Sequence, residues 1–124
     1  MGSDKMNKAK IESRISDIIS KFEKDYMGRG SKDIKTKIIQ NHILIFIDGF
    51  LSKSEQQLAY DIKGISLIKE TGTELFEKTR EDLEALIKGI VDINIVSTHS
   101  DVSTKTGEKV IVLTVDCDLE SRLI

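Results

Sequence analysis

The 124-residue sequence contains no proline, no tryptophan and a single cysteine, Cys117. Aromatic residues make up only 5% of it, so Ile, Leu and Val must fill the core. One cysteine excludes an intramolecular disulfide and a cysteine-based zinc cage, which fits a reducing compartment. Because no proline-rich linker divides the chain, and its length suits one core, we expect a single domain.

A strong net charge and a long apolar run are also missing. The formal net charge is -2, so no overall field favours nucleic acid or an anionic membrane. The apolar run at 43–47 is far shorter than the ~20 residues of a membrane-spanning helix. We therefore expect a cytoplasmic protein with no nucleic-acid partner and no membrane span. Residues 1–5 lack a secretory signal and precede a second methionine, so we expect a foreign or disordered tail, with one domain over 6–124.

The first half of the chain shows a helical pattern followed by two strand patterns. Apolar residues recur at helical spacing over 5–26, and the glycines at 28–30 end that pattern. Alternation over 34–38 predicts a strand with one face in water. The apolar, β-branched run at 42–50 predicts a central strand. The turn residues 40–41 would join the two strands as a hairpin.

A second helical region follows the hairpin. Ser52 and Glu55 fit a capping box, in which each side chain satisfies a backbone N–H at a helix start. We expect Gly64 to break or bend this region. A long apolar stripe then predicts a second major helix that ends near Gly89.

The last third of the chain predicts a second hairpin, made of β-branched runs at 90–102 and 109–117 with a polar connection at 103–108. The order αββααββ indicates an α+β fold of two layers, in which long helices cover one face of a four-stranded, mainly antiparallel sheet. The other face would expose apolar side chains, which a homodimer would cover. These are Leu44, Phe46, Val110 and Val112.

Several motifs follow in a fixed order along the chain. They are Gly28-Arg29-Gly30, Gly49-Phe50-Leu51-Ser52 with Glu55, then Arg80, then His99-Ser100-Asp101-Val102-Ser103-Thr104 and Gly107-Glu108. In these motifs the sequence resembles the MpsC family over nearly its whole length after the tail. Ser31, where we expect the family to favour proline, and Phe50 depart from the pattern.

The MpsC family consists of small bacterial proteins named for a sodium-translocating, membrane-potential-generating system. The resemblance implies a soluble accessory or regulatory protein associated with a membrane sodium or bicarbonate transport system. Because the sequence contains no membrane span, such a protein would lie peripheral to the membrane through a partner subunit.

Two segments could contact a ligand or partner. The glycines of 28–32 permit close backbone approach, and Arg29 beside Gly30 could hold an anion, although a helix C-cap and turn explain the same residues. The hydroxyl-rich segment 101–107, with Thr104 and Lys105, suits either a tight turn or recognition of a polar ligand.

His99 and Asp101 are two residues apart in a predicted strand, so their side chains share a face. They could form a hydrogen-bonded structural or anion-binding cluster, or an acid–base pair. A metal site needs a further ligand that no motif supplies, and we predict neither a metal nor a cofactor. Arg80 lies among glutamates at helical spacing, as in ordinary ion pairing.

The leading hypothesis is a non-enzymatic protein that acts as a homodimer and binds a protein partner or small anion. The predicted contact residues are Arg29, Gly30, Arg80, His99, Asp101, Thr104 and Lys105. One alternative is a small enzyme in which His99 acts as general base, Asp101 orients it and the substrate is anionic. Another is a purely structural dimerisation module.

Overall fold

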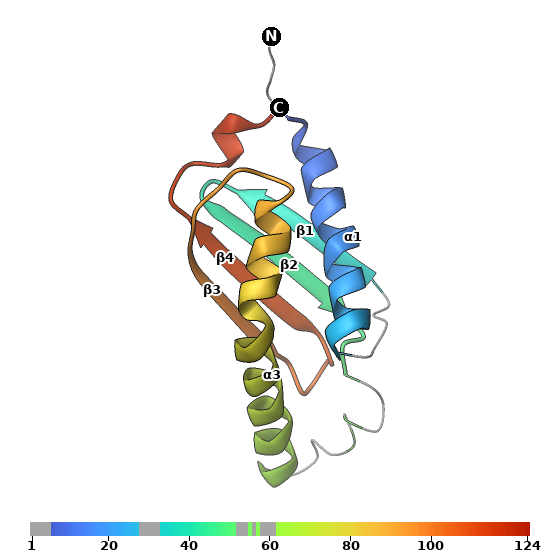
Figure 1. Cartoon of the computed structure of the whole chain (residues 1–124). Helices are drawn as coiled ribbons and strands as arrows, with labels where there is room; N and C mark the ends of the chain where they lie inside the picture. Colours follow the sequence, from blue (N-terminus) through green and yellow to red (C-terminus); the bar gives the residue numbers. More distant parts are fainter. Residues whose placement is uncertain (1–5, 28–32, 52–54, 56, 58–61) are drawn as a thin grey trace.

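The computed structural model describes residues 6–27, 33–51, 55, 57 and 62–124 (Figure 1). The elements are α1 (Lys8–Met27), β1 (Asp33–Ile39), β2 (His42–Asp48), α3 (Ile62–Lys88), β3 (Ile95–Val102), β4 (Lys109–Val115) and the short 3-10 helix η1 (Glu120–Arg122). Glu55 and Gln57, between β2 and α3, are also helical. The predicted α+β class and the order αββααββ are confirmed. The capping residue Ser52 lies outside the described residues.

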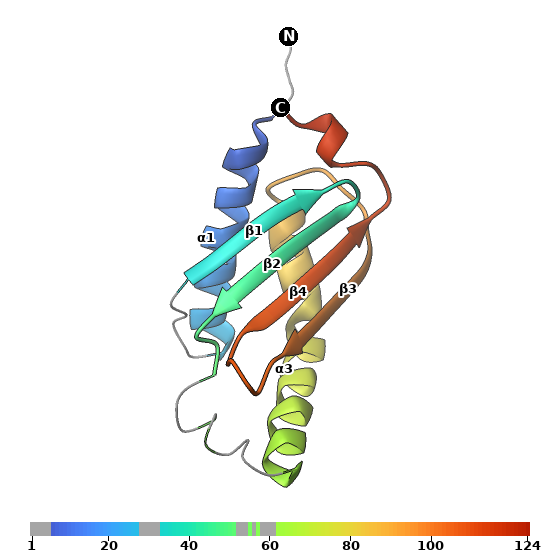
Figure 2. The ribbon, with the colours of Figure 1, turned by 180° about the vertical axis from the view of Figure 1, so that it is seen from behind.

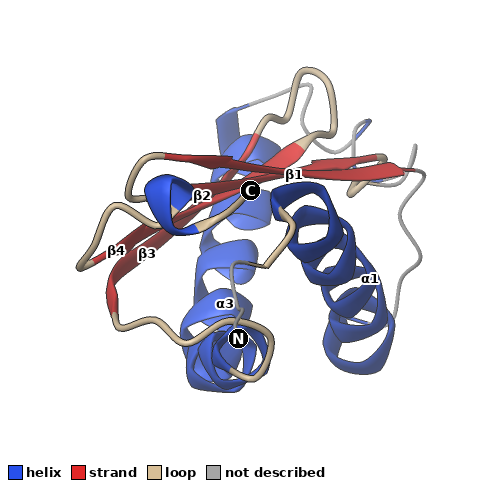
Figure 3. Cartoon of the chain, turned by 90° about the horizontal axis from the view of Figure 1, so that it is seen from above, coloured by secondary structure: helices blue, strands red, loops and turns tan. Residues whose placement is uncertain are grey.

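The four strands form one antiparallel sheet in the order β1-β2-β4-β3. The two predicted hairpins, β1-β2 and β3-β4, join along β2 and β4, which become the central strands. Helices α1 and α3 lie on the same side of this sheet, α1 against β1 and α3 against β3 (Figure 3). The protein therefore has two layers, with its core between the helices and one sheet face.

The core is aliphatic, as the shortage of aromatic residues predicts. The apolar stripe of α1 supplies Ile11, Ile15, Ile19 and Phe22, all buried. The sheet meets it with alternate residues of its central strands, because successive side chains of a strand point to opposite faces. These buried strand residues are Ile43, Ile45 and Ile47 of β2 and Ile111, Leu113 and Val115 of β4.

Gly64 lies inside a helix, so the predicted break does not occur there. Helix α3 begins at Ile62 and continues without interruption through Gly64 to Lys88. A single glycine costs a helix interior only about 1 kcal/mol relative to alanine, and the tertiary packing of a 27-residue helix offsets such a loss.

Three of the strands are shorter than predicted. β2 ends at Asp48 because Gly49 adopts a positive φ of 69°, and β4 ends at Val115. β3 begins at Ile95 instead of residue 90. The segment before it is apolar because it closes the end of the core, where Ile90, Val91 and Ile93 are buried outside any strand. An apolar composition therefore indicates that this segment is buried. It does not distinguish a strand from a buried connection.

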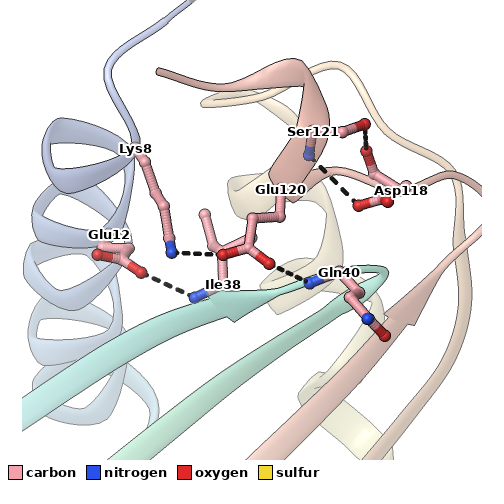
Figure 4. Close-up of polar contacts among 7 residues, drawn as sticks. All are labelled: Lys8, Glu12, Ile38, Gln40, Asp118, Glu120 and Ser121. Atoms are coloured by element: carbon pink, nitrogen blue, oxygen red, sulfur yellow. Dashed lines mark hydrogen bonds and ion pairs between the residues drawn. The ribbon is translucent and has the colours of Figure 1, made fainter.

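A carboxylate network ties the start of α1 and the 3-10 helix η1 to the β1-β2 turn (Figure 4). Glu120 accepts hydrogen bonds from Lys8 Nζ at 2.8 Å and from the Gln40 backbone N–H at 2.9 Å. The hydrogen bond from Lys8, followed by that from Gln40, lowers the pKa of the Glu120 carboxyl group. The same bond raises the pKa of the Lys8 ammonium group. Both carboxylate oxygens of Glu120 therefore hold separate parts of the fold together.

Candidate interaction surface

One face of the sheet is uncovered by any helix among the described residues (Figure 2). We call it the open face. Strand register places its side chains in two rows of four that cross β1, β2, β4 and β3 in turn. The first row is Lys35, Phe46, Val110 and Asp101, and the second row is Lys37, Leu44, Val112 and His99.

Both rows have an apolar centre and polar ends. The four central side chains, from β2 and β4, are only half-buried, as expected where no other element of the described chain covers them. Ile39, on the same face of β1, is 48% exposed and extends the apolar area. The β1 edge carries the exposed cations Lys35 and Lys37, whereas the β3 edge carries the exposed Asp101 carboxylate. Charge is therefore distributed asymmetrically across one apolar surface.

A pocket of about 370 Å³ adjoins the Asp101 end of the open face. Its lining includes Lys69, Asp101, Ser103, Thr104, Lys105 and Glu108. Lys69 reaches Asp101 from α3, with Nζ 2.9 Å from Oδ1. This hydrogen bond is the largest cause of the lowered pKa of the Asp101 carboxyl group, and a backbone hydrogen bond from Val102 adds to it. Asp101 is therefore held as an anion beside two lysines.

The connection between β3 and β4 is ordered by its own hydrogen bonds. The Ser103 N–H donates to the Glu108 carbonyl, and the Gly107 N–H donates to the Ser103 carbonyl, both at 2.8 Å. The Ser103 hydroxyl accepts from the Thr106 N–H at 3.2 Å. Gly107 has a φ of 78°, a conformation that favours glycine. Turn geometry therefore accounts for Ser103, Thr106 and Gly107, although Ser103 also lines the pocket with Thr104 and Lys105.

The structure brings together four of the seven predicted contact residues. Asp101, Thr104 and Lys105 line the pocket, and His99 lies on the same face of β3 as Asp101. Arg80 belongs to α3, on the other side of the sheet, where its Nη1 lies 3.7 Å from Glu77 Oε2. This is the ordinary i,i+3 pairing that the sequence predicts. Arg29 and Gly30 lie outside the described residues.

The Asp101 carboxylate is oriented by the Lys69 ammonium group, through the hydrogen bond described above. His99 and Asp101 are both exposed and stand two residues apart on an edge strand. The pocket therefore presents the ammonium groups of Lys69 and Lys105 and the hydroxyl of Thr104, whereas His99 is not part of its lining. In the part of the chain that the structure describes, no group of three or more His, Cys, Asp or Glu residues could hold a metal ion.

A buried ion pair, Lys109 with Glu23, lies on the helix-covered side and was missed by the sequence interpretation. Lys109 Nζ lies 3.4 Å from Glu23 Oε1 and 4.4 Å from the ring centroid of Phe50, in cation–π contact. The sequence does indicate this ion pair, because each partner is a charged residue at a core-facing position of its element. Glu23 continues the i,i+4 series of Ile15 and Ile19 on the stripe of α1 that faces the core, and Lys109 precedes Ile111 on the same face of β4.

The sequence profile of the family described as "Na+-translocating membrane potential-generating system (MpsC)" matches residues 7–117. The chain belongs to the MpsC family. A Bacillus subtilis (strain 168) relative, "Uncharacterized protein YbcI", is 40% identical over 119 residues, which are 96% of each chain. No solved structure matches the chain significantly. Among the described residues of this MpsC-family chain, every helix is too short or too polar to cross a membrane.

Proposed function

We propose that this MpsC-family chain is a soluble accessory or regulatory protein, without enzymatic activity, that acts as a homodimer and binds a protein partner or a small anion. One observation carries the proposal: the two central strands present apolar side chains on the open face. Sheets are stable when their apolar faces are buried against another layer, and large uncovered apolar areas mark interaction sites. A second copy supplies the missing layer.

The polar end of the open face is the proposed site for the partner or anion. Lys69 and Lys105 place two cations at the pocket, and the Thr104 hydroxyl adds a hydrogen-bonding group. A carboxylate, phosphate or bicarbonate group could pair with Lys105 while Lys69 holds Asp101. A partner protein with an exposed acidic side chain would use the same groups.

The family description supplies the physiological setting for this proposal. It names a membrane system that translocates sodium, so the expected partner is a subunit of such a sodium-translocating system. The protein would then be cytoplasmic and reach the membrane by contact with that subunit. This setting predicts that membrane association depends on a protein and on the pocket residues.

Membrane co-sedimentation tests the proposal. Purified protein is mixed with membranes from cells that encode it, before and after protease treatment of those membranes. We expect the wild type to sediment with untreated membranes and to stay in solution with treated ones. The double variant Thr104→Ala/Lys105→Ala should sediment several-fold less, because it removes the hydroxyl and the ammonium group that the pocket offers to the partner.

A matched control keeps this result interpretable. Lys63→Ala removes an exposed charge near the start of α3, away from the pocket residues, and should sediment like the wild type. Circular dichroism must show that every variant is folded. If the folded double variant and the wild type sediment equally, or if neither sediments with untreated membranes, the proposed accessory role fails.

A further inference from the structure

We infer that two copies pack their open faces together about a twofold axis that runs parallel to the strands and passes between β2 and β4. This inference rests on the homodimer proposed above, and it adds the orientation of the partner and the residues that meet. It starts from the strand register, in which each row runs from a lysine on β1 to Asp101 or His99 on β3.

A rotation about this axis reverses the order of the strands across the sheet. It leaves the position of each residue along the strand direction unchanged. The β1 edge of one copy therefore lies over the β3 edge of the other. Lys35 then faces the partner's Asp101, because these two residues end the same row. By symmetry the contact occurs twice, as every contact does in an isologous dimer.

The other in-plane axis, perpendicular to the strands, gives a worse arrangement. It would place β1 of one copy over β1 of the other, which brings the exposed lysines Lys35 and Lys37 toward their own counterparts. Like charges that face each other across an interface oppose association, whereas complementary charges select orientation and register. The distribution of charge on the open face therefore selects the axis parallel to the strands.

The centre of the proposed interface is apolar and self-complementary. The same axis places Phe46 over the partner's Val110 and Leu44 over the partner's Val112, because each pair occupies one row on the two central strands. Large side chains from β2 thus meet smaller ones from β4. Two such faces can pack about 10 Å apart with their strands about 30° from parallel, as in aligned sheet packing.

The open face fits a second copy better than a lipid surface. An anionic membrane would require cations at both edges of the face, but one edge ends in Asp101. Next to the row that contains Phe46, the strand register places Asp33 of β1 opposite Asp48 of β2, and both residues are exposed. These carboxylates close the apolar area at that end and remain in solvent at the rim of the dimer.

Two charge-reversal variants test the orientation. Lys35→Glu should place a carboxylate against the partner's Asp101, and Asp101→Lys should place an ammonium group against the partner's Lys35. Each homodimer then carries two repulsive pairs, so each should dissociate at least about tenfold more readily than the wild type. A mixed dimer of the two variants regains an attractive pair, in which the introduced carboxylate faces the introduced ammonium group, beside the native pair of Lys35 with Asp101. Native mass spectrometry, with one variant isotopically labelled, should therefore show mixed dimers in excess of the statistical share.

Asp101→Lys also removes the hydrogen bond to Lys69, so Lys69→Met serves as the control and should dimerise like the wild type. Folded variants that mix at the statistical share, while the wild type is a dimer, would overturn the inferred orientation but leave homodimerisation intact. A wild type that stays monomeric at micromolar concentration would instead overturn both the orientation and the homodimer on which it rests.

Discussion

Lys109 and Glu23 form an ion pair in which the side chains are only 3% and 1% exposed. Breaking a buried pair by removing one partner costs about 3–5 kcal/mol, because a charge is left behind in the interior. We expect Lys109→Met to lower the free energy of unfolding by that amount, measured by urea denaturation. A loss below about 1 kcal/mol, the size typical of an exposed pair, would contradict this account.

The double variant Glu23→Leu/Lys109→Met distinguishes the ion pair from simple packing. Replacing both charges by apolar groups of similar size is often neutral or stabilising. The double variant should therefore be more stable than Lys109→Met alone. If it is less stable than the single variant, the two side chains contribute independently of each other.

Glu12 protects the free edge of β1. Its Oε2 accepts a hydrogen bond from the backbone N–H of Ile38 at 2.8 Å (Figure 4). Glu12→Ala should lower the free energy of unfolding by about 1–3 kcal/mol, because that N–H loses its acceptor. Glu12→Gln retains an acceptor oxygen and should cost less. Amide hydrogen exchange should show faster exchange at Ile38 in the alanine variant alone, and equal rates in both variants would contradict the assignment.

The stability of the fold should depend on pH through Glu120. Its pKa in the folded state lies below the ordinary value of 4.5, so the unfolded chain binds the proton more readily. The ionised Glu120 carboxylate therefore stabilises the fold above about pH 4.5, and this contribution is lost as the pH falls through the folded-state pKa. Urea denaturation at several pH values should show that the free energy of unfolding falls less below pH 4.5 for Glu120→Gln than for the wild type. If the free energy of unfolding depends on pH in the same way for both proteins, this role of Glu120 is contradicted.

His99→Glu should strengthen the proposed dimer. The inferred axis places residue 99 opposite the partner's Lys37, so a carboxylate there creates two new attractive pairs. We expect the dissociation constant, measured by sedimentation equilibrium, to fall a few-fold. Ser97→Glu is a matched control on the same face, where the register places Ile39 at the opposite edge. Tightening by both variants would show that the effect does not depend on Lys37.

The sequence predicts the elements of this fold well because each has a clear local pattern. Alternation identifies β1, and the uninterrupted apolar run identifies β2 as a central strand. The boundaries are less accurate where two structures share one composition. Ile90, Val91 and Ile93 are β-branched and apolar, as in a strand, but they are buried in a connection.

The candidate surface was predictable only in part. The spacing of His99 and Asp101 places them on one face, and the turn chemistry of 103–107 is local. The contact of Lys69 with Asp101 joins residues 32 positions apart and depends on how α3 lies along β3, which no local pattern specifies. The Lys109–Glu23 pair left a signal, a charge at a core-facing position in each element, but its partners are 86 positions apart.

Sedimentation equilibrium of three proteins tests the central claim most directly, namely that the open face joins two copies. The wild type should be a dimer at micromolar concentration, and Phe46→Lys, which places a charge at the centre of the face, should be a monomer. Leu67→Lys changes a residue on α3 that is 54% exposed and should remain a dimer. A monomeric wild type, or a folded Phe46→Lys variant that dimerises like the wild type, would contradict the claim.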